Sequence, residues 1–318
     1  MKTYLSLLEE ILRNGKRKGT EHGIETIGCH GLVFRHDVRD GWPLLTTKTI
    51  NYKHQVAELL WYLSGESHIR NLRKHAGYWG AWADDEGHLQ SAYGRFWRRF
   101  PTPEPLDFAG RCDIENGTVN VSPYENDEVW VHHNNPFSDW DEDVHGPVVD
   151  QFALAIHALE KDINTRRAVV SAWHPGNAYF SKLPPCHVMF RFGFDGEALT
   201  LTAYQRSADM PLGAPYNIAQ YSLLLMLVAN SLGVPAGSYV HLFDDAHIYV
   251  NQLDGVYEQI KREPKPLPQI IVPDKHVLDL GWDDVDDFAL VNYDPHPPVK
   301  FPITEVGVHK YNKQGEKI

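Results

Sequence analysis

The decisive stretch of the sequence runs Leu183-Pro184-Pro185-Cys186-His187, and Gln205-Arg206-Ser207-Ala208-Asp209 follows it later in the chain. Each proline fixes its own φ, so Cys186 is expected in a rigid turn. The strand-like segments on either side of Asp195-Gly196 predict a hairpin that brings Arg206 back beside Cys186. A thiol attacks as the thiolate, and a nearby guanidinium lowers its pKa. A lone cysteine is commonly a small buried hydrophobe, but this pair favours a nucleophile.

Length and charge narrow the class of protein. The chain has 318 residues, of which 42% are hydrophobic, and this is enough for a sizeable core. Its formal net charge is −12, with 30 Lys and Arg against 42 Asp and Glu. A general nucleic-acid binder needs a basic face for phosphates, so nucleic acid is not an expected partner. The charge is compatible with a single bound nucleotide, because a few local arginines can grip one phosphate.

Cysteine usage and apolar runs bear on location. The three cysteines, Cys29, Cys112 and Cys186, are a sparse and odd set, which suits a reducing compartment, and no Cys/His zinc spacing is present. Residues 1–13 have the pattern of an amphipathic helix and not that of a signal peptide. The longest apolar run, around 223–229, is too short to span a bilayer. We therefore expect a cytoplasmic protein without a metal or a membrane partner.

The elements expected from hydrophobic periodicity mix without a regular strand–helix alternation. This favours an α+β fold in a single domain over residues 1–318. Helices are expected at 1–13, 52–64, 148–161, 217–232 and 245–262, and strands at 27–35, 168–173, 188–194, 198–204, 238–243 and 268–272.

Ordered blocks along nearly the whole chain resemble the thymidylate synthase family. They begin with the first helix and include Asp40–Lys48, Glu58–Trp61, Trp82–Asp84, Arg166–Trp173, the segments around Cys186 and Arg206, Asp245–Tyr249 and Tyr293–Pro297. The resemblance implies a mixed, twisted sheet with helices on one face and a dimer interface on the other. It also implies transfer of a one-carbon unit from 5,10-methylenetetrahydrofolate to C5 of dUMP through a covalent adduct on Cys186.

The resemblance assigns catalytic roles to four residues besides Cys186. Glu58 matches a carboxylate that acts through ordered water, and Tyr93 matches a tyrosine that helps to remove the C5 proton. Arg206 matches the cation beside the thiol, and Asn217 can donate to O4 and accept from N3–H of uracil. Two alternatives stay open: Glu58 could be an exposed rim residue, and Asn217 could be an N-cap for the following helix.

Further residues match substrate and cosubstrate positions. Arg206 and Ser207 match phosphate ligands from the same subunit, whereas Arg166 and Arg167 match a pair that reaches the partner's site in a homodimer. His247 and Tyr249 match ligands of the ribose 3′-hydroxyl, with ordinary core packing as the alternative. Asp209 is expected at both the nucleotide and the folate. The remaining matched folate positions are Lys48, Trp79, Trp82 and Gly213.

Residues 101–147 look like an insertion, rich in Pro, Asn, Asp and Glu, where the family usually has a short connection. His132-His133, Asp139 and Asp141 are residue types that can bind a metal ion, but they lack the ligand spacing of an established metal site. A solvated acidic loop is therefore expected.

Departures from the family pattern bear on the product. Glu21 stands where the family usually has a phosphate-gripping Arg, Gln90-Ser91 replace part of a usual turn, and residues 305–318 extend past the usual end. Because these elements close the site, they predict that water reaches the C5 methylene intermediate. The expected product is then 5-hydroxymethyl-dUMP, as in phage-type hydroxymethylases of the family. The alternatives are a thymidylate synthase that makes dTMP and dihydrofolate, and a non-catalytic paralogue that binds nucleotide.

Overall fold

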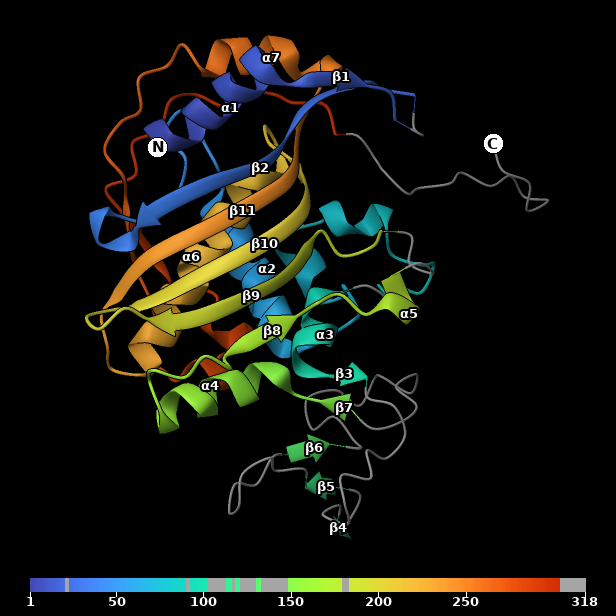
Figure 1. Ribbon diagram of the computed structural model, residues 1–318, viewed down its shortest axis with the longest axis vertical. Helices are drawn as coiled ribbons and strands as arrows, with labels where there is room; N and C mark the ends of the chain where they lie inside the picture. The colour runs from blue at the N-terminus through green and yellow to red at the C-terminus, as the bar shows by residue number, and fades with distance from the viewer. Residues whose placement is uncertain are drawn as a thin grey trace, which may run out of the picture.

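A six-stranded mixed sheet organises the computed structural model, which describes residues 1–20, 23–89, 92–101, 113–115, 118–120, 130–132, 148–178 and 183–303. The strand order is β1-β2-β11-β10-β9-β8, and only β10 and β11 run parallel to each other (Figure 1). The strands span Lys16–Lys18 (β1), Thr26–Asp37 (β2), Val169–Ser171 (β8), His187–Phe194 (β9), Leu199–Asp209 (β10) and Ala236–Tyr249 (β11).

Helices and smaller sheets surround this sheet. The helices are α1 (Lys2–Asn14), α2 (Tyr52–Ser64), α3 (Tyr93–Arg98), α4 (Gln151–Lys161), α5 (Pro175–Ala178), α6 (Gly213–Ser231) and α7 (Leu253–Gln259). Short 3₁₀ turns lie at Val38–Asp40, Leu72–Lys74, Tyr78–Ala81, Val250–Gln252, Val277–Asp279 and Trp282–Asp284. The small sheets pair β3 (Phe100–Pro101) with β7 (Val148–Val149), β12 (Gln269–Ile271) with β13 (Ala289–Val291), and β4 (Asp113–Glu115) with β5 (Thr118–Asn120) and β6 (Trp130–His132).

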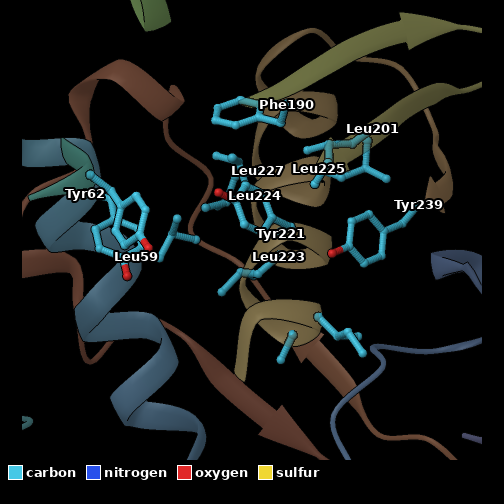
Figure 2. Close-up of a cluster of buried hydrophobic side chains, with 14 of the residues drawn as sticks. Leu59, Tyr62, Phe190, Leu201, Tyr221, Leu223, Leu224, Leu225, Leu227 and Tyr239 are labelled. Atoms are coloured by element: carbon cyan, nitrogen blue, oxygen red, sulfur yellow. The ribbon is translucent and has the colours of Figure 1, made fainter. Parts of the chain in front are cut away.

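The core lies between one face of the sheet and α2, with α6 in the middle. Figure 2 shows leucines of α6 between Leu201 and Tyr239 of the sheet and Leu59 and Tyr62 of α2. A helix that is apolar on almost all sides is stable only when other elements cover it, and this sandwich covers α6. On the opposite sheet face Met189 and Val169 remain 38% and 37% exposed.

The parallel strands β10 and β11 are joined by α6, which forms a crossover unit. Parallel neighbours need such a connection, because a tight turn can join only antiparallel strands. In the register of this pair Ser207 lies beside Asp245 and Asp209 beside His247. Residues of both strands and of the first turns of α6 therefore meet at one end of the sheet.

Much of the predicted secondary structure is confirmed, including the α+β class, the helix at 52–64 and the hairpin of β9 and β10 around Asp195-Gly196. The helix predicted over 245–262 is wrong in its first part. Residues up to Tyr249 belong to β11, because they pair with β2 and β10, and α7 begins only at Leu253.

Two other helix boundaries differ from the sequence prediction. The helix predicted at 217–232 begins earlier, at Gly213, and tolerates Pro215 because the first turn of a helix needs no amide donor there. The helix predicted at 148–161 begins at Gln151, where the Asp150 side chain accepts from the Ala153 N–H.

Several predictions fall partly or wholly outside the described residues. Glu21, Gln90-Ser91, Cys112, most of the 101–147 insertion and residues 304–318 belong to this group. The described parts of the insertion are the three short antiparallel strands β4, β5 and β6, so the insertion is not loop throughout. Within the described ranges, no helix is both long and apolar enough to cross a membrane.

Candidate active site

Cys186 and Arg206 lie side by side at the open end of the β9–β10 hairpin. The Arg206 N–H donates to the Cys186 carbonyl at 2.9 Å, and its guanidinium donates to the carbonyls of Pro185 at 2.9 Å and Pro184 at 2.8 Å. One guanidinium nitrogen, Nη2, is 3.9 Å from Sγ of Cys186. The arginine thus holds the diproline turn and places its charge against the thiol.

Burial dominates the electrostatics of the thiol. It raises the pKa of Cys186 above its usual value, and the Arg206 charge opposes that rise without cancelling it. The sequence predicted that the arginine lowers the thiol pKa, and Arg206 acts in that direction; the larger effect of burial was not part of that prediction.

Tyr93 fixes the turn from α3. Its hydroxyl accepts the Cys186 N–H at 2.9 Å, and its ring stacks on the imidazole of His187 with centroids 4.5 Å apart. Burial lowers the pKa of His187 to about 4, so the ring is neutral at neutral pH. His187 was not singled out from the sequence, although its position directly after Cys186 was the available signal.

Glu58 is a buried carboxylate on α2, only 4% exposed, so the rim alternative is wrong. The Trp79 indole N–H donates to one carboxylate oxygen and the Gln220 amide to the other. Burial raises the pKa of Glu58, while these donors act in the opposite direction. Gln220 is a polar residue on an otherwise apolar helix, which was its signal in the sequence.

Asn217 lies inside α6, not before it, so the N-cap alternative is wrong. The Gln205 side chain donates to its amide oxygen at 3.1 Å and also to the Ser207 carbonyl at 2.9 Å. The donor from Gln205 thus fixes the rotation of the Asn217 amide.

His247 and Tyr249 share one face of β11, as alternate residues of a strand must. The His247 ring bonds through Nδ1 to the Asp245 carbonyl at 3.1 Å and packs edge-on against Tyr249 at 5.1 Å. Burial, with the nearby Asp209 and Cys186, raises the pKa of Tyr249 to about 12. The thiol thus acts on the tyrosine through charge, and both rings are buried enough to serve in packing as well.

A cation from β1 approaches the same region. The Lys18 ammonium lies 2.5 Å from the Asp245 carboxylate, which is also 3.6 Å from Nδ1 of His247. The hydrogen bond with His247 and the bond with Lys18 hold the pKa of Asp245 well below its usual range.

Two of the expected folate residues, Lys48 and Gly213, lie near Asp209. Its carboxylate accepts from the Leu212 N–H at 3.0 Å and from the Gln252 amide at 2.9 Å, and burial raises its pKa. Lys48 donates to the Pro211 carbonyl at 2.6 Å, and burial lowers its pKa to about 8. Trp79 and Trp82 pack edge to face at 5.7 Å, and Gly213 begins α6 close by.

Arg166 and Arg167 do not join these residues. They are exposed on the loop between α4 and β8. Because Val169 pairs with Arg191, Arg167 lies beside the far end of β9, about 20 Å along the strand from Cys186. That span exceeds the reach of an arginine side chain, so neither guanidinium reaches Cys186 of the same chain.

No group of three or more potential metal ligands occurs among the described residues, and residues 133–141 of the suggested His/Asp cluster fall outside them. Asn51 caps α2 by accepting from the Lys53 N–H at 3.1 Å.

Comparison with known proteins identifies the class of this site. The family model for thymidylate synthase matches residues 2–305. The thymidylate synthase of Haloferax volcanii is 33% identical over 352 aligned positions, which cover 94% of this chain and 95% of the relative. The chain belongs to the thymidylate synthase family. It is an enzyme that transfers a one-carbon unit to C5 of dUMP, with 5,10-methylenetetrahydrofolate as cosubstrate.

Replacing Arg206 by Met should raise the pKa of Cys186 further, because burial is then unopposed. The pH at which iodoacetamide alkylates Cys186 at half its maximal rate should rise by about one unit or more. Arg206→Lys, which keeps a charge, should fall between. Arg191→Met, on the same hairpin, is the control, and identical midpoints in wild type and Arg206→Met would contradict the assignment.

Replacing Gln220 by Met removes a donor from the ionised form of Glu58, so the pKa of Glu58 should rise. Since a hydrogen bond to a charged group contributes about 1.5–3 kcal/mol, the limb of the pH–kcat profile that reports Glu58 should move up by about one to two units. Ser222→Ala, buried on the same helix, should leave that limb in place. A limb that stays in place or moves to lower pH in Gln220→Met would disprove this role.

Proposed function

We propose that this enzyme is a thymidylate synthase, which converts dUMP and 5,10-methylenetetrahydrofolate to dTMP and dihydrofolate. The named relative supports this reading over the 5-hydroxymethyl-dUMP expected from the sequence. The motives for that expectation, Glu21, Gln90-Ser91 and residues 305–318, fall on or run into segments outside the described residues.

The observation that carries the proposal is the aromatic wall beside Glu58. Trp79 packs against Trp61 at 5.8 Å, Trp82 at 5.7 Å and Tyr93 at 6.2 Å, and its N–H is engaged by the carboxylate. A wall of this kind excludes water from the neighbourhood of C5. With water excluded, the methylene intermediate receives hydride from tetrahydrofolate and becomes a methyl group.

Each proposed catalytic residue acts at a particular step of the reaction. The Cys186 thiolate adds to C6 of the pyrimidine, which makes C5 nucleophilic toward the one-carbon unit. Charge that develops at O4 is met by Asn217 and, through water, by Glu58. Tyr93 stands beside Cys186 to assist removal of the C5 proton. Elimination of tetrahydrofolate leaves the methylene, and after hydride transfer the departing thiolate restores Cys186.

Base and phosphate recognition follow the same division. We assign uracil to Asn217, because the Gln205 side chain donates to its amide oxygen and holds the amide in one orientation. Arg206 and Ser207 supply the phosphate ligands of the same subunit, and His247 and Tyr249 the ribose ligands. Arg166 and Arg167, too far from their own Cys186, supply the partner's site in a homodimer that packs through the exposed face around Met189.

Identification of the nucleotide product tests the proposed function. During turnover of dUMP, absorbance near 340 nm should rise in step with dTMP, because tetrahydrofolate is oxidised to dihydrofolate. Mass spectrometry of the nucleotide gives the product directly, and Cys186→Ser is the inactive control. A flat trace with a product one oxygen heavier than dTMP would instead establish the hydroxymethylase, and no tritium release from [5-³H]dUMP would reject C5 chemistry altogether.

Replacing Asn217 by Asp should shift the base preference from uracil toward cytosine. A protonated carboxyl can donate to N3 and accept from N4 of cytosine, whereas dUMP leaves buried polar groups unpaired. The ratio of kcat/KM for dUMP to that for dCMP should fall by about 100-fold or more. A wild-type enzyme that already prefers dCMP would show the assignment of Asn217 to be wrong.

A further inference from the structure

Gln252 is a buried glutamine, 1% exposed, that follows β11 and contacts three separate parts of the structure. Its side-chain oxygen accepts the Tyr249 N–H at 3.3 Å. Its amide nitrogen donates to the Asp209 carboxylate at 2.9 Å and to the Pro302 carbonyl at 3.3 Å. One side chain thus joins the nucleotide end of the site, the carboxylate expected at the folate and the last described segment of the chain.

That segment, residues 299–303, packs closely onto α7 and Lys48. The Phe301 ring covers the Lys48 ammonium with 4.5 Å between nitrogen and ring centroid. It also lies against Gly255, where a Cβ would come within 2.6 Å of the ring, so a glycine is needed for this packing. Lys48 is only 4% exposed as a result.

The bonds of Gln252 link Asp209 energetically to this packing. Desolvation raises the pKa of Asp209, and a carboxylate oxygen that loses its donor in such a place is costly. The same NH2 group also donates to the Pro302 carbonyl. A rotation of the Gln252 side chain that breaks this bond and releases residues 299–303 therefore also breaks its hydrogen bond to Asp209. Movement of the segment and the readiness of Asp209 for a folate are therefore expected to change together.

We propose that Gln252 is a positioning residue that couples the docking of residues 299–303 to the orientation of Asp209, and thereby tunes binding of the folate. The kinetic test of this proposal rests on the proposed function, because it measures turnover with the folate. The structural test does not rest on it. The residue acts through Asp209 and Pro302 and has no contact with the reacting atoms.

The kinetic test uses Gln252→Met, which keeps the length of the side chain and removes all three polar contacts. KM for methylenetetrahydrofolate should rise about tenfold, as expected for loss of a hydrogen bond to a charged group, while kcat and the Kd of dUMP alone change less than about threefold. Gln151→Met is the matched control, because Gln151 also accepts one N–H and donates to two carbonyls, far from Asp209. Gln252→Glu keeps the acceptor but opposes Asp209 with a second carboxylate, and should raise this KM at least as much.

The structural test measures how firmly residues 299–303 are docked, and it requires no catalytic turnover. The buried Lys48 amine reacts with an acylating reagent only when the reagent can reach it, so its acetylation rate reports how well residues 299–303 cover it. In Gln252→Met, acetylation of Lys48 by sulfosuccinimidyl acetate, followed by peptide mass spectrometry, should be about five times faster or more, relative to the exposed Lys53 as internal reference. Phe301→Ala, which uncovers Lys48 directly, is the positive reference and should reproduce the higher folate KM.

The outcomes separate the two proposals. Unchanged Lys48 acetylation and an unchanged folate KM in Gln252→Met would overturn the coupling, as would equal effects in Gln151→Met. If Gln252→Met does not fold, the double variant Gln252→Glu with Phe301→Ala decides the matter, because coupled positions give less than the product of the single effects. If the wild type makes no dTMP, the proposed function fails, and the acetylation rates still test the coupling.

Discussion

The site depends on the register of the parallel pair β10 and β11, which α6 connects. Ser207 stands beside Asp245 and Asp209 beside His247, and the first turns of α6 bring Asn217 over the same end of the sheet. A slip of one residue would turn each of these side chains to the opposite face. Such a slip would also turn core residues of the strands, such as Leu201 and Tyr239, away from the leucines of α6 that they pack against (Figure 2).

Burial sets the charge states that the chemistry begins from. The pKa values of Cys186, Glu58 and Asp209 are raised by burial, and those of Lys48 and His187 are lowered by it. A carboxyl whose folded pKa lies above its unfolded value contributes stability that is complete at low pH and falls as the pH rises through the folded pKa. At neutral pH Glu58 and Asp209 therefore reduce the stability of the fold, a cost that is common where function needs buried ionisable groups.

The sequence predicted the elements that carry a local signal and missed the consequences of long-range pairing. The turn of β9 and β10 and the helix at 52–64 follow from residues close together in the chain. Asp245–Tyr249 have no such signal, and their pairing with β2 and β10 on both sides makes them a strand. The net rise of the thiol pKa could not be predicted for the same reason, since the depth of burial at Cys186 is a property of the assembled fold. Family motifs supplied the expected ligands, whereas the residues that hold them in place became visible only through contacts.

Those holding residues share a chemical character. Gln205 donates to Asn217, Gln220 to Glu58 and Gln252 to Asp209, so three neutral amides orient the groups expected to meet the base and the folate. A neutral donor fixes a carboxylate in place but offsets only part of the burial that raises its pKa, whereas an arginine or lysine in the same place would hold it firmly ionised. The cations Arg206 and Lys18 stand instead beside Cys186 and at Asp245. In the proposed assignment the Arg206 charge lies where the phosphate dianion binds, and neutral donors hold the groups that exchange protons.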